Sequence, residues 1–112
     1  MSGNALSDTQ VRRAQAYLEV NGTRHPLSGG SLVVGRGTEA DLRINDPGVS
    51  RRHVEFRTIN GHDGPEVTVY DLGSTNGMLV DGQKTTSAVL DNGGQVRVGS
   101  TVLTLHVVEE SA

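Results

Sequence analysis

Two polar clusters of the chain carry the residue types that bind anions. The first lies in residues 33–56 (VVGRGTEADLRINDPGVSRRHVEF) and the second in residues 71–82 (DLGSTNGMLVDG). Each cluster adjoins an alternating apolar run, so both are predicted to be loops at the ends of strands. The hydrogen-bond donors that they offer are guanidinium, hydroxyl and amide groups: Arg36, Ser50, Arg51, Arg52, Ser74, Thr75 and Asn76.

These donor types suit a phosphate group. An arginine fork can bind two phosphate oxygens at once, and hydroxyl groups can donate to the oxygens that remain. Loops on a rigid sheet hold such donors in place beforehand, so little ordering entropy is lost on binding. A protein phosphate carries a charge of about −1.5 to −2 at neutral pH, which the unmodified hydroxyl lacks. The two clusters therefore predict a phosphate-recognising binding module.

Composition predicts a single small all-β domain. The chain has 112 residues, enough for one core. Aromatic residues make up only 3% and Trp is absent, so the core must consist of Val, Leu and Ile. The 15 glycines, well above the average usage of about 7%, indicate many tight turns between short strands.

Charge and residue counts exclude several other classes. The formal net charge is −3, whereas a general nucleic-acid binder is normally basic. No stretch has the length and apolarity of a membrane span or signal peptide, and the absence of Cys fits a reducing compartment. We therefore expect a cytoplasmic protein without membrane insertion. Four histidines lack the spacing of metal ligands, so no metal and no cofactor is expected: His25, His53, His62 and His106.

Short runs of alternating or continuous apolar residues recur along the chain, separated by turn residues. Asn21-Gly22 and Asp81-Gly82 are typical two-residue hairpin turns, and residues 60–65 (NGHDGP) are predicted to be a loop. This spacing is typical of an antiparallel sandwich or barrel. The predicted strands are 17–20, 24–27, 32–34, 42–44, 53–58, 67–70, 78–80, 88–90, 96–98 and 101–107.

The domain boundaries follow from the same pattern. Residues 1–15 are polar without strand alternation and are predicted to be a flexible linker or an appended remnant. Residues 16–108 are expected to form the domain, and residues 109–112 an acidic tail.

Three strings in the clusters resemble the motifs of the forkhead-associated (FHA) domain. They are Gly35-Arg36, then Ser50-Arg51-Arg52-His53, then the run DLGSTNG at residues 71–77. All three occur in the family's order and with family-like spacing, and the resemblance covers residues 17–108. The sequence GSTNGMLVDG at residues 73–82 and the acidic tail most resemble those of the C-terminal FHA domain of mycobacterial FhaA-type proteins.

The resemblance implies a β-sandwich of about eleven mostly antiparallel strands in two sheets, whose loops at one end bind a phosphothreonine peptide. Carried over by position, Arg36 and Ser50 would bind the phosphate, and Arg51 would add a side-chain or backbone contact. Thr75 would hold the phosphate side of the pocket, and Asn76 would bond the peptide backbone. Ser74 is a further candidate for direct contact.

Three other positions would support the site in the family's pattern. His53 would tether the loop that presents Ser50, Gly35 would be architectural, and Gly77 would permit the turn after Asn76. Arg52 is expected to lie opposite the anion loop and to pair with a carboxylate.

The resemblance also implies the partner. We expect a Thr-phosphorylated protein or its phosphorylated segment, either a Ser/Thr kinase or a kinase substrate, bound by a monomeric signalling adaptor. No nucleic acid is expected.

Two alternatives remain open on the sequence. Ser50 and His53 with Asp46 or Asp71 could form a nucleophile set, although Ser50 is not on a nucleophile elbow and no Walker lysine follows a glycine-rich loop. The fold could also serve as a phosphate-independent scaffold that holds partners by a sheet face or an edge strand.

Overall fold

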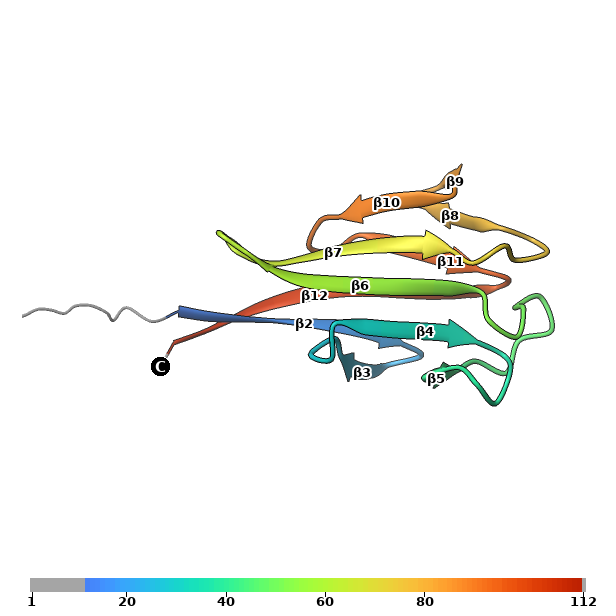
Figure 1. Ribbon diagram of the computed structural model, residues 1–112, viewed down its shortest axis with the longest axis horizontal. Helices are drawn as coiled ribbons and strands as arrows, with labels where there is room; N and C mark the ends of the chain where they lie inside the picture. The colour runs from blue at the N-terminus through green and yellow to red at the C-terminus, as the bar shows by residue number, and fades with distance from the viewer. Residues whose placement is uncertain (1–11, 112) are drawn as a thin grey trace, which may run out of the picture.

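The computed structural model describes residues 12–111, which form two packed β-sheets (Figure 1). The five-stranded sheet has the order β10-β7-β6-β4-β5. Its strands are β4 (Ser31–Gly35), β5 (Leu42–Arg43), β6 (Val54–Gly61), β7 (Gly64–Asp71) and β10 (Ser87–Leu90). The six-stranded sheet has the order β3-β2-β12-β11-β8-β9. Its strands are β2 (Arg12–Val20), β3 (Thr23–Pro26), β8 (Met78–Val80), β9 (Gln83–Thr85), β11 (Gln95–Val98) and β12 (Thr101–Ser111).

The predicted fold class is confirmed. The strands of both sheets run along the long axis of the molecule in Figure 1, so the sheets are the two layers of a sandwich. Every strand pair is antiparallel except β4–β5. No helix that could cross a membrane occurs within residues 12–111.

The two predicted hairpin turns are confirmed. Asn21 (φ 51°) and Gly22 (φ 81°) connect β2 to β3, and Asp81 (φ 48°) and Gly82 (φ 85°) connect β8 to β9. Positive φ at both central residues matches the right-handed twist of the flanking strands, and Asn, Asp and Gly tolerate it best. Pro26 lies on β3, an edge strand, where its missing N–H costs no sheet hydrogen bond.

The loop predicted for residues 60–65 is wrong. β6 and β7 continue through this segment, with Asn60 opposite Pro65 and Gly61 opposite Gly64, and only His62 and Asp63 form the turn. The strands extend past the core here, where only Gly64 and Pro65 are partly buried, so no apolar alternation marks this segment. Backbone pairing between β6 and β7 holds the hairpin. Ala14 of β2 also lies close to it, since a Cβ built on Gly64 would be 3.5 Å from the Ala14 Cβ.

The edges of the domain also extend beyond the expected positions. β2 begins at Arg12 and not at residue 16, and β12 continues to Ser111. The two strands pair along this whole length, with Arg12 opposite Ser111. Cross-strand backbone hydrogen bonds therefore order a polar stretch that the apolar pattern did not mark. The rest of the predicted linker, residues 1–11, lies outside the described residues.

The core between the sheets is mostly aliphatic, as predicted. Val54 and Phe56 of β6 are fully buried, whereas Glu55 between them faces outward. Leu18, Leu103 and several valines from the opposite sheet complete the same cluster, and Phe56 is the largest fully buried side chain. Alternate residues of β2, β6, β7, β11 and β12 thus form most of the core, which fixes the register of the sheets.

Strand direction brings the two polar clusters to one end of the sandwich. β4 and β7 are both antiparallel to β6, so the ends of β4 and β7 and the start of β6 lie at the same edge. Val34, Val54 and Asp71 form one row across these strands, and the donor residues of both clusters lie beyond it in the loops. The loops β4–β5, β5–β6 and β7–β8 and the turn β11–β12 gather at this end, on the right of Figure 1.

Phe56→Ala should lower the free energy of unfolding by about 3–5 kcal/mol, because it removes the largest fully buried side chain and leaves a cavity. Urea unfolding measures this change. Val89→Ala is the control, since Val89 is 61% exposed on an edge strand and should lose less than about 1 kcal/mol. Equal losses in the two variants would contradict the assignment of the core.

Candidate functional site

The first two loops of this end are joined backbone to backbone. The Arg36 N–H donates to the Ser50 carbonyl at 2.9 Å, and the Gly37 N–H donates to the Arg51 carbonyl at 3.0 Å. The chains approach so closely that a Cβ on Gly35 would lie 2.1 Å from the Arg51 oxygen. Glycine is therefore required at position 35, where it allows the loop with Ser50 and Arg51 to lie against β4.

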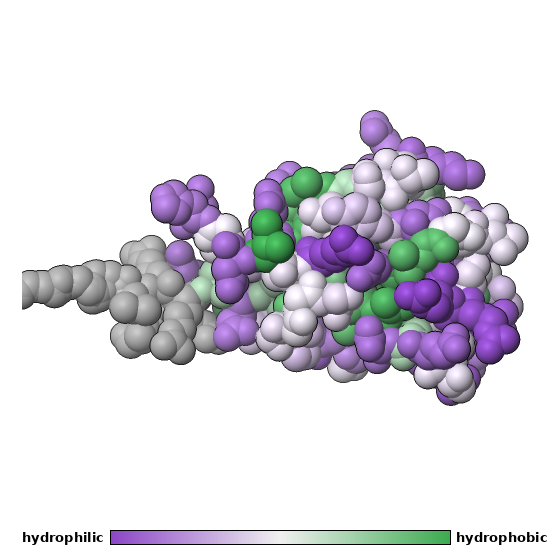
Figure 2. Space-filling view, viewed as in Figure 1, coloured by the Kyte–Doolittle hydropathy of each residue, from purple (hydrophilic) through white to green (hydrophobic). Residues whose placement is uncertain are grey.

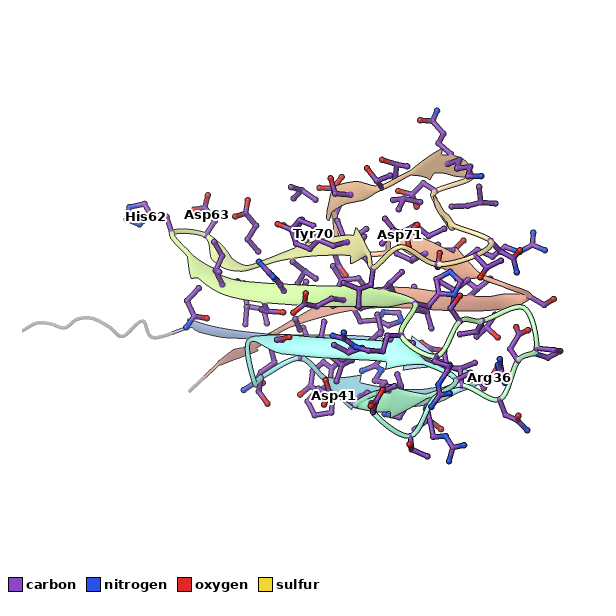
Figure 3. All side chains as sticks on the ribbon, turned by 45° about the vertical axis from the view of Figure 1, so that its right-hand side comes forward. Arg36, Asp41, His62, Asp63, Tyr70 and Asp71 are labelled. Atoms are coloured by element: carbon purple, nitrogen blue, oxygen red, sulfur yellow. The ribbon has the colours of Figure 1, made fainter. Side chains whose placement is uncertain are left out.

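The Arg36 side chain is fixed at its base and free at its tip. Its Nε donates to the Val49 carbonyl at 2.9 Å, which leaves both terminal nitrogens without a protein partner within residues 12–111. The side chain is exposed and lies at the loop end of the sandwich, opposite the hairpin tip with His62 and Asp63 (Figure 3). A guanidinium held in this way presents its terminal N–H groups to an anion with little loss of entropy.

The Ser50 hydroxyl lies where the two clusters meet. The Thr75 N–H donates to Ser50 Oγ at 3.0 Å, so the hydroxyl keeps its own hydrogen to donate. Ser50 comes from the β5–β6 loop and Thr75 from the β7–β8 loop, so this bond brings donors of both clusters together. Both residues retain access to solvent.

His53 is fully buried beneath these loops. The Ser50 N–H donates to its Nδ1 at 3.0 Å, and its Nε2 lies 2.6 Å from the Gly77 carbonyl oxygen. Since Nδ1 accepts a hydrogen bond, the ring proton must be on Nε2, which donates to Gly77. The neutral imidazole thus ties the Ser50 loop to the β7–β8 loop, the tether that the sequence analysis expected.

The β7–β8 loop is held by its own polar side chains. Asn76 Nδ2 donates to the Gly48 carbonyl at 3.0 Å, which leaves the Asn76 amide oxygen available to a ligand. Ser74 Oγ accepts from the Gly77 N–H at 2.9 Å, and Asp71 Oδ1 accepts from the Ser74 N–H at 2.9 Å. The Ser74 oxygen is thus engaged in its own turn, where Gly77 adopts a φ of 75°.

Arginines concentrate around the Arg36 tip. Arg51 is exposed and borders a hollow of about 280 Å³ together with Arg36 and Arg43. Strongly hydrophilic side chains gather at this end of the space-filling view, over the loops between β4 and β6 (Figure 2). Arg52 is exposed, but the carboxylate partner expected for it is absent within residues 12–111. The acidic chain therefore has a locally basic end.

The sequence analysis named Asp46 only as a possible member of a nucleophile set, but in the structure it is a buried anchor of the site. Its carboxylate accepts from the Gly48 N–H, the Ser100 N–H and the Thr101 hydroxyl, each at 2.8 Å. Hydrogen bonds from Gly48, Thr101 and Ser100, in this order of size, lower the pKa of Asp46 below its ordinary value. Nothing in the sequence indicated that the β11–β12 turn would be the partner of Asp46.

Arg43 was missed altogether. The alternation of residues 42–44 marks it only as an exposed strand position. Parallel pairing of β5 with β4 places Arg43 opposite Gly35, beside Arg36.

Within residues 12–111 no group of three or more His, Asp or Glu side chains could hold a metal ion. The chemistry that this end offers is the binding of an anion.

Comparison with known proteins finds the same architecture. The family model of the FHA domain matches residues 32–99. The glycogen accumulation regulator GarA of Mycolicibacterium smegmatis is 41% identical over 78 residues, which are 70% of this chain and 47% of that protein. The chain thus spans less than half the length of this relative.

Two solved structures share the fold. One is from a structural and functional analysis of phosphothreonine-dependent FHA domain interactions, with a TM-score of 0.74, 33% identity and coverage of 82% of this chain and 95% of that chain. The other is the FhaA FHA domain in complex with the intracellular domain of Rv3910, with a TM-score of 0.73, 33% identity and coverage of 81% and 99%. The expected similarity of this chain to FhaA is confirmed, and the chain is also similar to GarA.

Gly35→Ala should lower the free energy of unfolding by about 3 kcal/mol, the upper part of the range for overpacking, because the new methyl group would collide with the Arg51 carbonyl. Urea unfolding measures the change. Gly29→Ala is the matched control, since no atom lies within 4 Å of its built Cβ, and its stability should stay equal or rise by up to about 1 kcal/mol. Equal effects at the two glycines would show that the close approach is not needed.

Asp46→Asn should reduce stability most at neutral pH. The asparagine side chain has one accepting oxygen where the carboxylate has two. Its NH₂ group would face the Ser100 N–H, and two donors cannot form a hydrogen bond with each other. Because the pKa of Asp46 is lowered on folding, the carboxylate stabilises the fold above its ordinary pKa, and this contribution is lost as pH falls through the folded-state value. In urea unfolding, the gap between wild type and variant should therefore narrow below about pH 4.

The control for this experiment is Asp63→Asn at the exposed hairpin tip, which removes a carboxylate without touching the Asp46 network. The free energy of unfolding of Asp63→Asn should differ little from that of wild type at neutral pH. A gap for Asp46→Asn that stays constant from neutral to acid pH would contradict the stabilising role of the charge.

Proposed function

Because this chain belongs to the FHA domain family, we propose that it is a phosphopeptide-binding module that recognises phosphothreonine in partner proteins. The observation that carries the proposal is the pair formed by Arg36 and Ser50. The guanidinium is anchored through Nε with its tip free, and the hydroxyl accepts from Thr75 with its hydrogen free. Both are held at the loop end of a rigid sandwich.

Each donor then has a distinct task. The Arg36 terminal nitrogens bind two phosphate oxygens, and the Ser50 hydroxyl donates to another. Arg51 adds positive charge at the rim, and Thr75 closes the pocket on the side of the β7–β8 loop. The free amide oxygen of Asn76 accepts a backbone N–H of the bound peptide.

The supporting residues act through these groups. Gly35 lets the Ser50 loop approach, His53 fixes that loop to Gly77, and Gly77 permits the turn. The Ser74 oxygen is occupied by the Gly77 N–H, so Ser74 is proposed to shape the loop, with only its hydroxyl hydrogen available to a ligand. All donors are thus placed before the phosphate arrives, which reduces the entropic cost of binding.

We propose a binding function without catalysis. In a nucleophile set, His53 would have to accept the Ser50 hydroxyl proton. Instead its Nδ1 accepts the Ser50 backbone N–H and its Nε2 bonds the Gly77 carbonyl. Asp46 is likewise occupied by three donors and does not orient the imidazole. Both ring nitrogens of His53 are engaged by backbone groups, so the imidazole has no free position to accept the Ser50 hydroxyl proton with either carboxylate.

The biological setting follows from the relatives. We propose a signalling adaptor downstream of Ser/Thr protein kinases in the cytoplasm, whose partner is a Thr-phosphorylated protein or segment. The solved complex of an FHA domain with an intracellular domain and the structures of phosphothreonine-dependent interactions support this class of partner. The adaptor is proposed to act as a monomer and to need neither cofactor nor nucleic acid.

Fluorescence anisotropy with a degenerate phosphothreonine peptide library tests the proposal. We expect micromolar binding, roughly −8 kcal/mol, to the phosphothreonine set and much weaker binding to its unphosphorylated and phosphoserine counterparts. Arg36→Ala should lose about 2–5 kcal/mol of binding free energy, the range for truncating one partner of a hydrogen-bonded charge pair. Equal affinity for phosphorylated and plain peptides would overturn the pocket and favour a phosphate-independent scaffold.

Arg24→Gln is the matched control for Arg36→Ala. It also removes one positive charge, but from the edge strand β3, where Arg24 is exposed and borders none of the hollows described around Arg36. Binding by this variant should equal that of wild type. A similar loss in both variants would attribute binding to net charge and not to the pocket.

A further inference from the structure

Arg43 is fixed beside Arg36 by the same kind of contact that orders Arg36 itself. Its Nε donates to the Arg36 carbonyl at 3.2 Å, as Arg36 Nε donates to the Val49 carbonyl at 2.9 Å. Both guanidinium groups are thus anchored at Nε by a backbone oxygen, and within residues 12–111 their terminal nitrogens bond no protein group. Two arginine forks therefore present unused donors at the same end of the sandwich.

The two arginines border two hollows in common. One, of about 350 Å³, is lined by Arg36, Arg43 and Asn45. The other, of about 280 Å³, is lined by Arg36, Arg43, Arg51, Gly37 and Thr38. Each is several times larger than the roughly 30 Å³ that one liquid water molecule occupies. Ser50 and Thr75 line neither, so this space extends from Arg36 toward β5 and away from Ser50 and Thr75.

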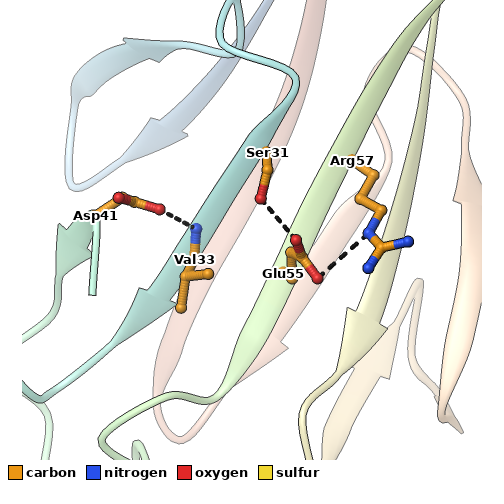
Figure 4. A network of polar contacts seen from close by, with 5 residues as sticks. All are labelled: Ser31, Val33, Asp41, Glu55 and Arg57. Carbon is orange, nitrogen blue, oxygen red and sulfur yellow. Dashed lines mark hydrogen bonds and ion pairs between the residues drawn. The ribbon is translucent and has the colours of Figure 1, made fainter. Parts of the chain in front are cut away.

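No carboxylate pairs with this cluster within residues 12–111, and three carboxylates of this sheet and its loops have other partners. Asp41 Oδ2 accepts from the Val33 N–H at 2.8 Å, and Glu55 accepts from the Ser31 hydroxyl at 2.6 Å and pairs with Arg57 at 3.3 Å (Figure 4). Asp46 is buried with its three donors. Neither Arg36, Arg43 nor Arg51 forms an ion pair within residues 12–111.

We propose that Arg43, which is anchored on the Arg36 carbonyl, forms a second anion position beside the phosphothreonine pocket. The domain then binds most tightly those phosphothreonine segments that carry another negative charge next to the modified residue, either an acidic side chain or a second phosphate. This inference rests on the proposed phosphothreonine binding and adds a specificity-determining residue to it. The like charges of the neighbouring guanidinium groups favour a ligand with more than one anionic group.

The experiment compares peptides that differ only in one flanking residue. A phosphothreonine peptide with neutral flanks is the reference, and in a series one Glu is moved through the flanking positions one at a time. At the best position, Glu is then replaced by a second phosphothreonine, or by Gln or unmodified Thr as neutral counterparts. Dissociation constants are measured by fluorescence anisotropy at one fixed ionic strength, since exposed charge pairs are screened by salt.

For wild type we expect one flanking position at which Glu raises the affinity about two- to fivefold, the range for an exposed ion pair. A second phosphate there should raise it further, because it carries more charge and more acceptor oxygens. If only Glu or only the second phosphate raises the affinity, the result identifies which of these two groups the second anion position binds.

Three variants locate the effect. Arg43→Gln should abolish the gain from the flanking charge while leaving the affinity for the neutral-flanked reference peptide within about twofold, which also shows that the variant is folded. Arg43→Lys should keep part of the gain, because it keeps the charge but not the fork. Arg24→Gln, the charge-matched control on β3, should keep the whole gain.

The outcomes separate this inference from the proposed function. A full gain retained in Arg43→Gln, or no gain at any flanking position in wild type, overturns the second anion position and leaves phosphothreonine binding intact. Failure of the reference peptide to bind better than its unphosphorylated counterpart overturns the proposed function, and the second anion position with it. The inference is supported if Arg43→Gln loses the affinity gain from the flanking charge and Arg24→Gln keeps it.

Discussion

A buried neutral imidazole holds the functional end of this protein together. His53 lies just before β6, and its two ring nitrogens bond backbone groups of two different loops, the Ser50 N–H and the Gly77 carbonyl. Because each bond requires the opposite character at its nitrogen, together they select one tautomer and one ring orientation. The Ser50 and Thr75 contact above it depends on this alignment.

The remaining loop contacts build on the same alignment. Gly35 allows the Ser50–Arg51 backbone to lie against β4, and Asp46 ties the start of the β5–β6 loop to the β11–β12 turn. The Asp46 carboxylate is itself enclosed, since a Cβ on Gly99 would lie 2.9 Å from its Oδ2. Four segments far apart in the chain thus position one small set of donors.

The charge distribution follows from how the carboxylates are used. The chain is acidic overall, with a formal charge of −3, yet its loop end is basic. Asp41, Asp46 and Asp71 all accept backbone N–H groups, so their charges stabilise turns and a strand and do not pair with the arginines. The guanidinium tips at the same end form no ion pair within residues 12–111 and stay open to a ligand.

The sequence by itself determined the elements whose cause is local. Asn21-Gly22 and Asp81-Gly82 define their hairpins because few residues adopt positive φ, and alternation in residues 53–58 defines the buried face of β6. The motif residues Arg36, Ser50, Thr75 and Asn76 could also be singled out, since their order and spacing are visible in the chain. Tertiary structure decided what depends on pairing between distant segments. The parallel register of β4 and β5 brought Arg43 to Arg36, the β2–β12 ladder ordered polar residues from Arg12 onward, and the fold brought Asp46 to Ser100. Each of these contacts involves a backbone group, which every sequence possesses, so side-chain type alone could not reveal them.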